Sequence, residues 1–137
     1  MYLLDTNVLS EMRKGGKAHP QVRRWVASVD AASLFLSVMS IFEMEKGVLL
    51  LERRDAVQGS VLRTWLRTRV LSAFKGRILP VDSEVALQCA ALHVPDPRSD
   101  RDSFIAATAV VYGMTVVTRN VADFKRTGVN LLNPWEP

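Results

Sequence analysis

The chain has 137 residues, 48% of them hydrophobic, which is enough to bury one sizeable core in a single domain spanning residues 1–137. No stretch approaches the roughly 18 consecutive apolar residues of a membrane helix, the N-terminus lacks the basic start of a secretory signal, and the only cysteine, Cys89, excludes an internal disulfide, so the sequence predicts a cytoplasmic protein. The formal net charge of +4 and the pI near 9.6 are compatible with a polyanionic partner such as RNA, although many small proteins are simply basic.

The first predicted element is a short buried strand that stops at a carboxylate. Residues 2–4 are apolar, whereas residues 5–7 are of types that prefer helix starts, so we expect a helix over about residues 7–12. Asp5 then lies at the carboxyl end of a strand, where ligands bind in open parallel sheets. A lone Asp in this context is also a common helix cap, so its function depends on whether other acids converge on it.

The next candidate acid follows a second predicted strand. Pro20 is expected to open a helix, and residues 33–38 form a largely apolar run that suits a strand buried on both faces. Ser40 is predicted to begin the following helix, with Glu43 at the spacing of a capping box. Gly47 lies one turn beyond Glu43, and because glycine inside a helix costs about 1 kcal/mol relative to alanine, it suggests close approach of a ligand or backbone. Glu43 is therefore either a cap or part of an acidic site.

A long helical stretch over residues 52–74 is predicted to form a hairpin with the helix before it. Residues 1–78 hold 13 Lys and Arg against 7 Asp and Glu, a net charge of +6, and the remainder of the chain holds 5 against 7, a net charge of −2. Arg63 and Arg67 lie largely outside the apolar stripe of this stretch. They either form a solvated face or contact a nucleic-acid backbone.

Three short strands are predicted in the second half of the chain, over residues 78–81, 115–118 and 130–132. The proline in the first of these favours a place at the sheet edge. Asp82 is expected to cap a helix that ends before Pro95.

Two further acids accompany the later elements. Residues 96–103 are polar and loop-like, and they lead into a helix of small residues over 104–112 that holds Asp102 at its start and ends at Gly113. Asp123 comes shortly after the strand that follows. Each of these acids alone has a local explanation, as a first-turn acid or a turn residue.

Together the acids favour a metal site. The alternation of strands and helices predicts an α/β fold with a mainly parallel sheet of four to five strands. In that topology Asp5, Glu43, Asp102 and Asp123 can face one crevice. Since two carboxylates about 4 Å apart repel by about 4 kcal/mol at an effective dielectric of 20, four of them need a cation. Oxygen ligands without His or Cys favour Mg²⁺ or Mn²⁺, and the matching chemistry is phosphodiester hydrolysis by a metal-activated water.

Four motifs and a C-terminal signature occur in a characteristic order. They are Leu4-Asp5-Thr6-Asn7-Val8-Leu9, then Ser40-Ile41-Phe42-Glu43 with Gly47, then Asp102-Ser103-Phe104-Ile105-Ala106-Ala107-Thr108-Ala109, then Val117-Thr118-Arg119-Asn120-Val121-Ala122-Asp123-Phe124, and finally Asn133-Pro134-Trp135. This series resembles the PIN-domain nucleases, and within them the VapC/FitB-like toxins of type II toxin-antitoxin pairs. The likeness covers essentially the whole chain.

The resemblance implies a three-layer α/β/α PIN-like domain with a protruding helical hairpin, acting as a ribonuclease toxin. It implies that four acids hold Mg²⁺ or Mn²⁺, with Asp5 and Asp102 as direct ligands: Asp5, Glu43, Asp102 and Asp123. Supporting polar groups would be Thr6, Asn7, Thr118 and Asn120. It also implies a homodimer and a cognate antitoxin that inserts a segment into the toxin and binds operator DNA.

Alternatives to this interpretation remain open. Asp96 and Asp100 lie close before Asp102, so the choice of the third acid rests on the Ile-Ala-Ala context that follows it. A catalytically silent PIN-fold subunit that binds RNA or a partner protein would keep the fold without the reaction. A receiver-like phosphoacceptor also places an acid at a strand end, but it needs a lysine where Thr118 and Arg119 stand.

Overall fold

The computed structural model describes all 137 residues and contains one five-stranded sheet with the strand order β3-β2-β1-β4-β5. Every neighbouring pair of strands is parallel. The strands are β1 (Tyr2–Leu4), β2 (Leu34–Ser37), β3 (Ile78–Leu79), β4 (Thr115–Val117) and β5 (Leu131–Leu132). All five carboxyl ends therefore meet at one edge of the sheet, with β1 in the centre. The predicted α/β class and the edge position of β3 are confirmed.

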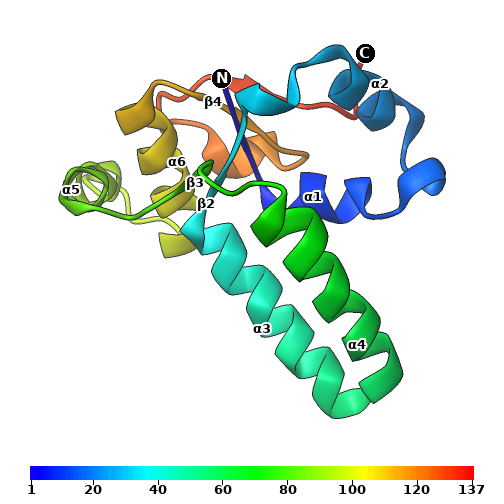
Figure 1. The fold of residues 1–137 in the computed structure, drawn as a ribbon. Helices are drawn as coiled ribbons and strands as arrows, with labels where there is room; N and C mark the ends of the chain where they lie inside the picture. The colour runs from blue at the N-terminus through cyan, green and yellow to red at the C-terminus, as the bar shows by residue number, and fades with distance from the viewer.

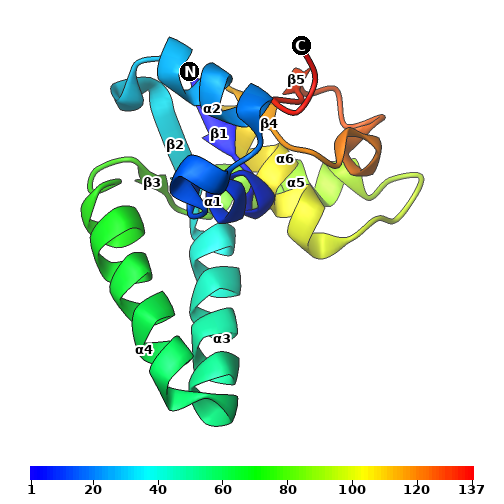
Figure 2. The same ribbon diagram turned by 90° about the vertical axis from the view of Figure 1, so that its right-hand side faces the viewer.

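Helices cover the sheet and extend beyond it. They are α1 (Thr6–Met12), α2 (Pro20–Ser28), α3 (Val38–Arg54), α4 (Ala56–Trp65), α5 (Ser83–Leu92) and α6 (Asp100–Tyr112). A π-helical stretch (Leu66–Ser72) prolongs α4, and short 3₁₀ helices cover Gly15–Lys17, Ala31–Ser33 and Val121–Phe124. Figures 1 and 2 show α3 and α4 side by side as a hairpin that projects away from the sheet. This is the protruding hairpin expected from the sequence.

The central strand β1 feeds two separate apolar cores. Adjacent residues of a strand point to opposite faces of the sheet, and Leu3 and Leu4 are both completely buried. Leu4 packs in the core that includes Val8 of α1 and Leu66 of the π-helical stretch. Leu3 packs in the core that includes Ile105 of α6. The sheet is thus the middle of three layers.

Small residues and a glycine determine how α6 lies. Its face toward the sheet is buried and includes Ala106 and Ala109, whose short side chains allow the helix backbone to approach the strands closely. Gly113 ends the helix with φ of 66°, a left-handed conformation that favours glycine. The predicted C-terminal role of Gly113 is confirmed, and the first turn of α6 is held firmly at the edge of the sheet.

Two helix starts differ from the sequence prediction. Helix α3 begins at Val38, and its cap is Ser37, whose Oγ accepts from the backbone N–H of Met39 at 3.0 Å. Ser40 lies inside the helix, is completely buried, and its Oγ has no hydrogen-bond partner, so the predicted capping box with Glu43 is wrong. Helix α6 begins at Asp100 rather than after residue 103, because Ser99 provides an earlier cap.

The predicted approach of another backbone to Gly47 is also wrong. A Cβ built on Gly47 would meet nothing within 4 Å, so no part of the protein approaches this face closely. The close approach occurs instead at Gly59 of α4, where a Cβ would lie 2.6 Å from the Cα of Glu52 in α3. Gly59 lets the two helices of the hairpin meet. No helix of the protein has the length and apolar character needed to span a membrane.

Candidate active site

A polar pocket of about 600 Å³ opens where the carboxyl ends of β1 and β4 meet the first turns of α1 and α6. Its lining is almost entirely polar, in contrast to the cores on either side of the sheet. The lining residues are Thr6, Asn7, Ser10, Glu11, Lys14, Glu43, Arg101, Asp102, Arg119, Asn120, Asp123 and Trp135. Asp5, directly behind Thr6, forms hydrogen bonds or ion pairs with several of them.

Asp5 is held in place from several sides. It is only 1% exposed, and its Oδ1 accepts from the backbone N–H of Thr6 at 2.7 Å, which caps helix α1. Its Oδ2 accepts from the hydroxyl of Thr118 at 2.8 Å and from the amide of Asn7 at 3.5 Å. Asp5 therefore has both roles that the sequence left open: it caps helix α1 and it belongs to the acid cluster. Both follow from its place at the end of β1, next to the start of α1.

The polar residues singled out in the sequence form a network around this carboxylate. Asn7 donates from Nδ2 to Oγ1 of Thr118 at 3.3 Å, and the backbone N–H of Asn120 donates to the same oxygen at 3.0 Å. The hydroxyl of Thr6 donates to Oε1 of Glu43 at 2.8 Å, which links α1 to α3. The network fixes two acids relative to each other although 37 positions separate Thr6 from Glu43 in the chain.

Arg101 joins the acids, and it was not among the site residues predicted from the sequence. Its guanidinium contacts Asp5 through Nη2, Glu43 through Nε at 2.8 Å, and Asp102 through Nη1 at 2.5 Å. The signal available in the sequence was an arginine directly before Asp102 in the first turn of a helix. That signal alone does not indicate a functional residue, since a charged residue at a helix start usually faces solvent.

Charge balance in the pocket is negative even with this arginine. The four acids Asp5, Glu43, Asp102 and Asp123 carry −4, and Arg101 contributes +1, which leaves −3 for the acid cluster. The other charged lining residues are Glu11, Lys14 and Arg119, and with them the pocket as a whole carries −2. Burial raises the pKa of Asp102, Arg101 opposes that shift, and the charges of Asp123 and Asp5 add to it. Burial would lower the pKa of Arg101, but its partners Glu43, Asp5 and Asp102 outweigh this and raise it, so the guanidinium stays charged.

The remaining acids take different positions. Asp123 lies in the 3₁₀ helix after β4, is exposed, and lines the pocket from its open side. Asp100 pairs with His93 at 3.5 Å and, like Asp96, does not line the pocket. Of the three neighbouring aspartates, the structure brings Asp102 to the other acids.

The two arginines considered for RNA contact lie on the hairpin, outside this pocket. Arg63 donates from Nη2 to Glu45 at 2.9 Å and to Glu52 at 3.1 Å, so it bridges α3 and α4. The hydrogen bonds that Arg63 donates to Glu45 and Glu52 raise the pKa of its guanidinium above the ordinary value. Arg67 is exposed on the π-helical stretch. Arg63 is thus paired within the protein, whereas Arg67 is exposed and forms no ion pair.

The donor set suits a hard divalent cation. The cluster offers carboxylate and hydroxyl oxygens and no sulfur or imidazole, which matches the preferences of Mg²⁺ and Mn²⁺. The guanidinium of Arg101 already acts as a stand-in cation among these oxygens. With that guanidinium between them, no three Asp, Glu, His or Cys side chains are close enough to hold one metal ion.

Fold and pocket together define an α/β protein with an acidic pocket at the carboxyl edge of a parallel sheet. The family model of the PIN domain matches residues 2–130, and the chain belongs to this family.

Full-length relatives share the likeness. The chain is 33% identical over 144 residues to VapC ribonuclease Y4jK of Sinorhizobium fredii, covering 100% of this chain and 99% of the relative. It is 34% identical over 140 residues to Toxin FitB of Neisseria gonorrhoeae, covering 98% and 99%. Among solved structures, FitAB bound to an IR36 DNA fragment superposes with a TM-score of 0.90 at 34% identity, covering 100% of this chain and 97% of that one. The expected family and PIN-like fold are confirmed.

Proposed function

We propose that the protein is an Mg²⁺- or Mn²⁺-dependent endoribonuclease that acts in the cytoplasm as the toxin of a type II toxin-antitoxin pair. The observation that supports this most strongly is the convergence of Asp5, Glu43 and Asp102, from three separate segments, on one positive charge. Relatives named as a VapC ribonuclease and as a toxin support the same assignment.

The acids and their polar neighbours have different roles in this proposal. Asp5 and Asp102 are the proposed direct ligands of the divalent cation, and Glu43 and Asp123 complete its acidic surroundings. When bound, such a cation supplies Lewis-acid activation of water and neutralises phosphate charge. Thr118 and Asn7 fix the orientation of the Asp5 carboxylate through its Oδ2.

Basic residues on the pocket rim suit the RNA backbone. Lys14 and Arg119 line the same pocket as the acids, and Arg119 lies over the ring of Trp135 at 5.4 Å. Cationic side chains beside a negatively charged pocket give phosphates a place to bind while the scissile bond faces the acids.

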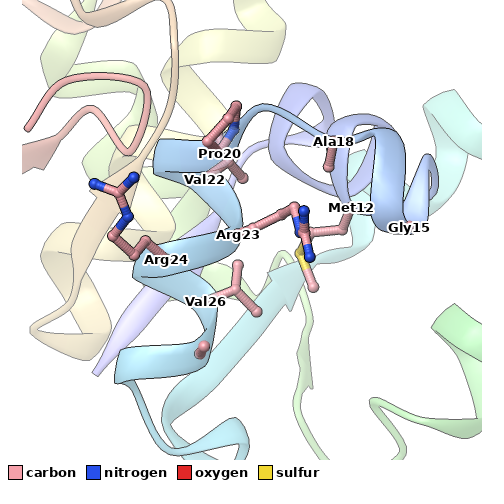
Figure 3. A pocket seen from close by; sticks show the side chains of 9 residues that line it. Met12, Gly15, Ala18, Pro20, Val22, Arg23, Arg24 and Val26 are labelled. Carbon is pink, nitrogen blue, oxygen red and sulfur yellow. The ribbon is translucent and has the colours of Figure 1, made fainter.

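Two surfaces suit the proposed protein partners. An apolar groove of about 610 Å³ runs along α2 and suits an inserted antitoxin segment. Figure 3 shows Met12, Val22 and Val26 among the side chains that line it. The arginines Arg23 and Arg24 also line it, so an acidic or carbonyl-rich segment is favoured. We propose that operator DNA is bound through the antitoxin, as the FitAB complex with DNA supports.

A separate apolar surface supports the homodimer. Phe42 and Leu50 on the outer face of α3 are 58% and 59% exposed, and with Leu49 they line a shallow apolar groove. Isolated exposed apolar residues are ordinary, but adjacent ones on one helix face typically mark an interface.

Metal removal tests the proposed reaction directly. RNA cleavage by the purified protein is expected to fall to background in EDTA and to return on addition of excess Mg²⁺ or Mn²⁺, because the acid cluster would lose the cation that activates water. Gel analysis of a labelled RNA measures this. Undiminished cleavage in EDTA would contradict the proposed metal-dependent reaction. The cleavage would then be assigned to a contaminating nuclease, which favours the alternative of a catalytically silent PIN-fold subunit.

Variants of the two hairpin arginines, Arg63 and Arg67, distinguish an effect on RNA binding from an effect on protein stability. Arg67→Ala is expected to weaken RNA binding and to reduce the slope of log affinity against log salt by about 1, because one phosphate contact is lost. Arg63→Ala, which removes the bridge to Glu45 and Glu52, is expected to lower the melting temperature and leave that slope unchanged. Filter binding at several salt concentrations measures the slope. An identical slope in Arg67→Ala would assign this residue to plain solvation.

A further inference from the structure

Arg101 is the feature of the pocket that the proposed function leaves unexplained. A metal-dependent nuclease needs carboxylates that are available to a divalent cation, yet three of the acids already share the guanidinium of their own chain. Each acid contacts a different nitrogen, with Asp5 at Nη2, Glu43 at Nε and Asp102 at Nη1. The guanidinium therefore lies at the centre of the cluster and not at its rim.

We propose that Arg101 is a positioning residue with two linked effects. It holds the acid cluster together before a metal ion arrives, and it competes with the divalent cation for the same carboxylates. The proposal rests on the proposed function, because it takes Asp5 and Asp102 to be metal ligands.

The contacts explain why the Arg101 guanidinium and a divalent metal ion cannot occupy the acid cluster at the same time. The oxygens that accept from Arg101 include Oδ1 of Asp5 and Oδ1 of Asp102, which are among the oxygens a metal ion would need. Asp5 is 1% exposed and Asp102 16% exposed, so neither can turn far toward solvent to serve both partners. A divalent cation that draws these carboxylates together has to displace the guanidinium from between them.

Displacement is sterically possible and electrostatically favoured. The Arg101 side chain is 30% exposed, so its long flexible stem has a path out to solvent. The acid cluster keeps a charge of −3 with the guanidinium in place, and the whole pocket, with Glu11, Lys14 and Arg119 included, keeps −2. The pocket therefore still attracts a divalent cation. The guanidinium thus lowers the affinity for metal without abolishing the attraction.

Another basic residue of the pocket, Arg119, provides a matched control for Arg101. Arg119 lines the same pocket, but its side chain lies over Trp135 and forms no ion pair with any of the acids. Replacing Arg119 by Gln changes the net charge by the same amount as replacing Arg101 by Gln. The pair of variants therefore separates the direct contact from the general electric field.

The test is a calorimetric titration of Mn²⁺ into the full-length protein and into the variants Arg101→Gln and Arg119→Gln. We expect Arg101→Gln to bind Mn²⁺ about tenfold or more tightly than the wild type, where tenfold corresponds to about 1.4 kcal/mol. The affinity of Arg119→Gln for Mn²⁺ is expected to rise clearly less than that of Arg101→Gln. Without metal, Arg101→Gln is expected to melt at a lower temperature than the wild type and to recover more on saturation with Mn²⁺, because uncompensated carboxylates repel.

Each outcome of the titration supports or overturns the proposal. A residue with a merely structural role would weaken Mn²⁺ binding when replaced, so equal or weaker binding in Arg101→Gln overturns the proposal. An equal gain in Arg119→Gln overturns it too, because general charge would then explain the effect. Absence of Mn²⁺ binding in all variants overturns both this proposal and the proposed function, whereas equal binding in wild type and Arg101→Gln leaves the function standing.

A second variant covers the case in which Arg101→Gln does not fold. Arg101→Lys keeps the charge but cannot reach three carboxylates with one planar group. Its affinity for Mn²⁺ is expected to lie between those of the wild type and Arg101→Gln, and an affinity at or below that of the wild type counts against the proposal.

Discussion

Replacing Asp5 with Asn is expected to lower RNA cleavage by at least about 100-fold, because changes even to the groups that orient a metal ligand cost 10- to 100-fold and Asp5 is a proposed direct ligand. The side chain keeps nearly the same shape, and an amide oxygen can still accept the N–H of Thr6 that caps α1. The loss would therefore come from the missing negative charge and not from a collapsed pocket. Rates with a labelled RNA in Mg²⁺ measure it.

Asp5→Asn is also expected to change the stability of the protein. From the sequence alone, relief of repulsion between acids predicts that Asp5→Asn leaves the stability within about 1 kcal/mol of the wild type or raises it. In the structure Asp5 is buried and paired with Arg101, so Asp5→Asn removes a charged hydrogen-bond partner and is expected to cost about 1–3 kcal/mol in the free energy of unfolding without metal. Urea unfolding monitored by circular dichroism gives this value.

Asp30 supplies the control for Asp5. Asp30 also accepts from a backbone N–H, that of Ala32 at 3.0 Å, but it lies outside the pocket. Asp30→Asn should cleave RNA at the wild-type rate. Wild-type cleavage by Asp5→Asn itself would remove the basis for the proposed metal site.

The second large effect is expected at Gly59, where alanine should destabilise the protein by about 1–3 kcal/mol, the usual cost of overpacking a tight contact. The added Cβ would lie 2.6 Å from the Cα and 2.9 Å from the backbone N of Glu52. Since these are backbone atoms of the neighbouring helix, they cannot rotate away, and α3 and α4 would have to separate. The gain in helix propensity from glycine to alanine offsets only part of this cost.

Gly47 is the matched control, because it is also a helical glycine of the hairpin, but a Cβ added there would meet nothing within 4 Å beyond its chain neighbours and its own helix backbone. Gly47→Ala should stabilise the protein by about 0.5–1 kcal/mol through helix propensity alone. Chemical unfolding of both variants measures the difference. If the two substitutions shift stability in the same direction, the close contact at Gly59 is not a constraint on the hairpin.

Strands and acids could be predicted well from the sequence because both depend on local pattern. Apolar runs such as residues 2–4 predict strands directly, and parallel strands bring their carboxyl ends to one edge. That rule places Asp5 and Asp123 at this edge, and the predicted helix starts direct Glu43 and Asp102 toward the same crevice. The family resemblance singled out Thr118, and its place directly after β4 brings its hydroxyl to Asp5.

The features that the sequence did not predict depend on contacts that a linear pattern does not contain. Ser37 and Ser40 are equally good caps by residue type, and the choice between them was decided by how far β2 extends. The close helix contact at Gly59, and not at Gly47, depends on which faces of α3 and α4 meet. Arg101 was missed because its importance arises from the direction of one long side chain after folding.

The strand order has a consequence for the nascent chain. The central strand β1 is made first, but its neighbour β4 comes from residues 115–117, and the hydroxyl of Thr118 reaches Asp5 across 113 positions of sequence. A ribosome releases the chain from its N-terminus onward, so the pocket stays incomplete until residues 115–123 have been synthesised. Nascent chains that stop before Asp123 therefore cannot carry the complete acid cluster.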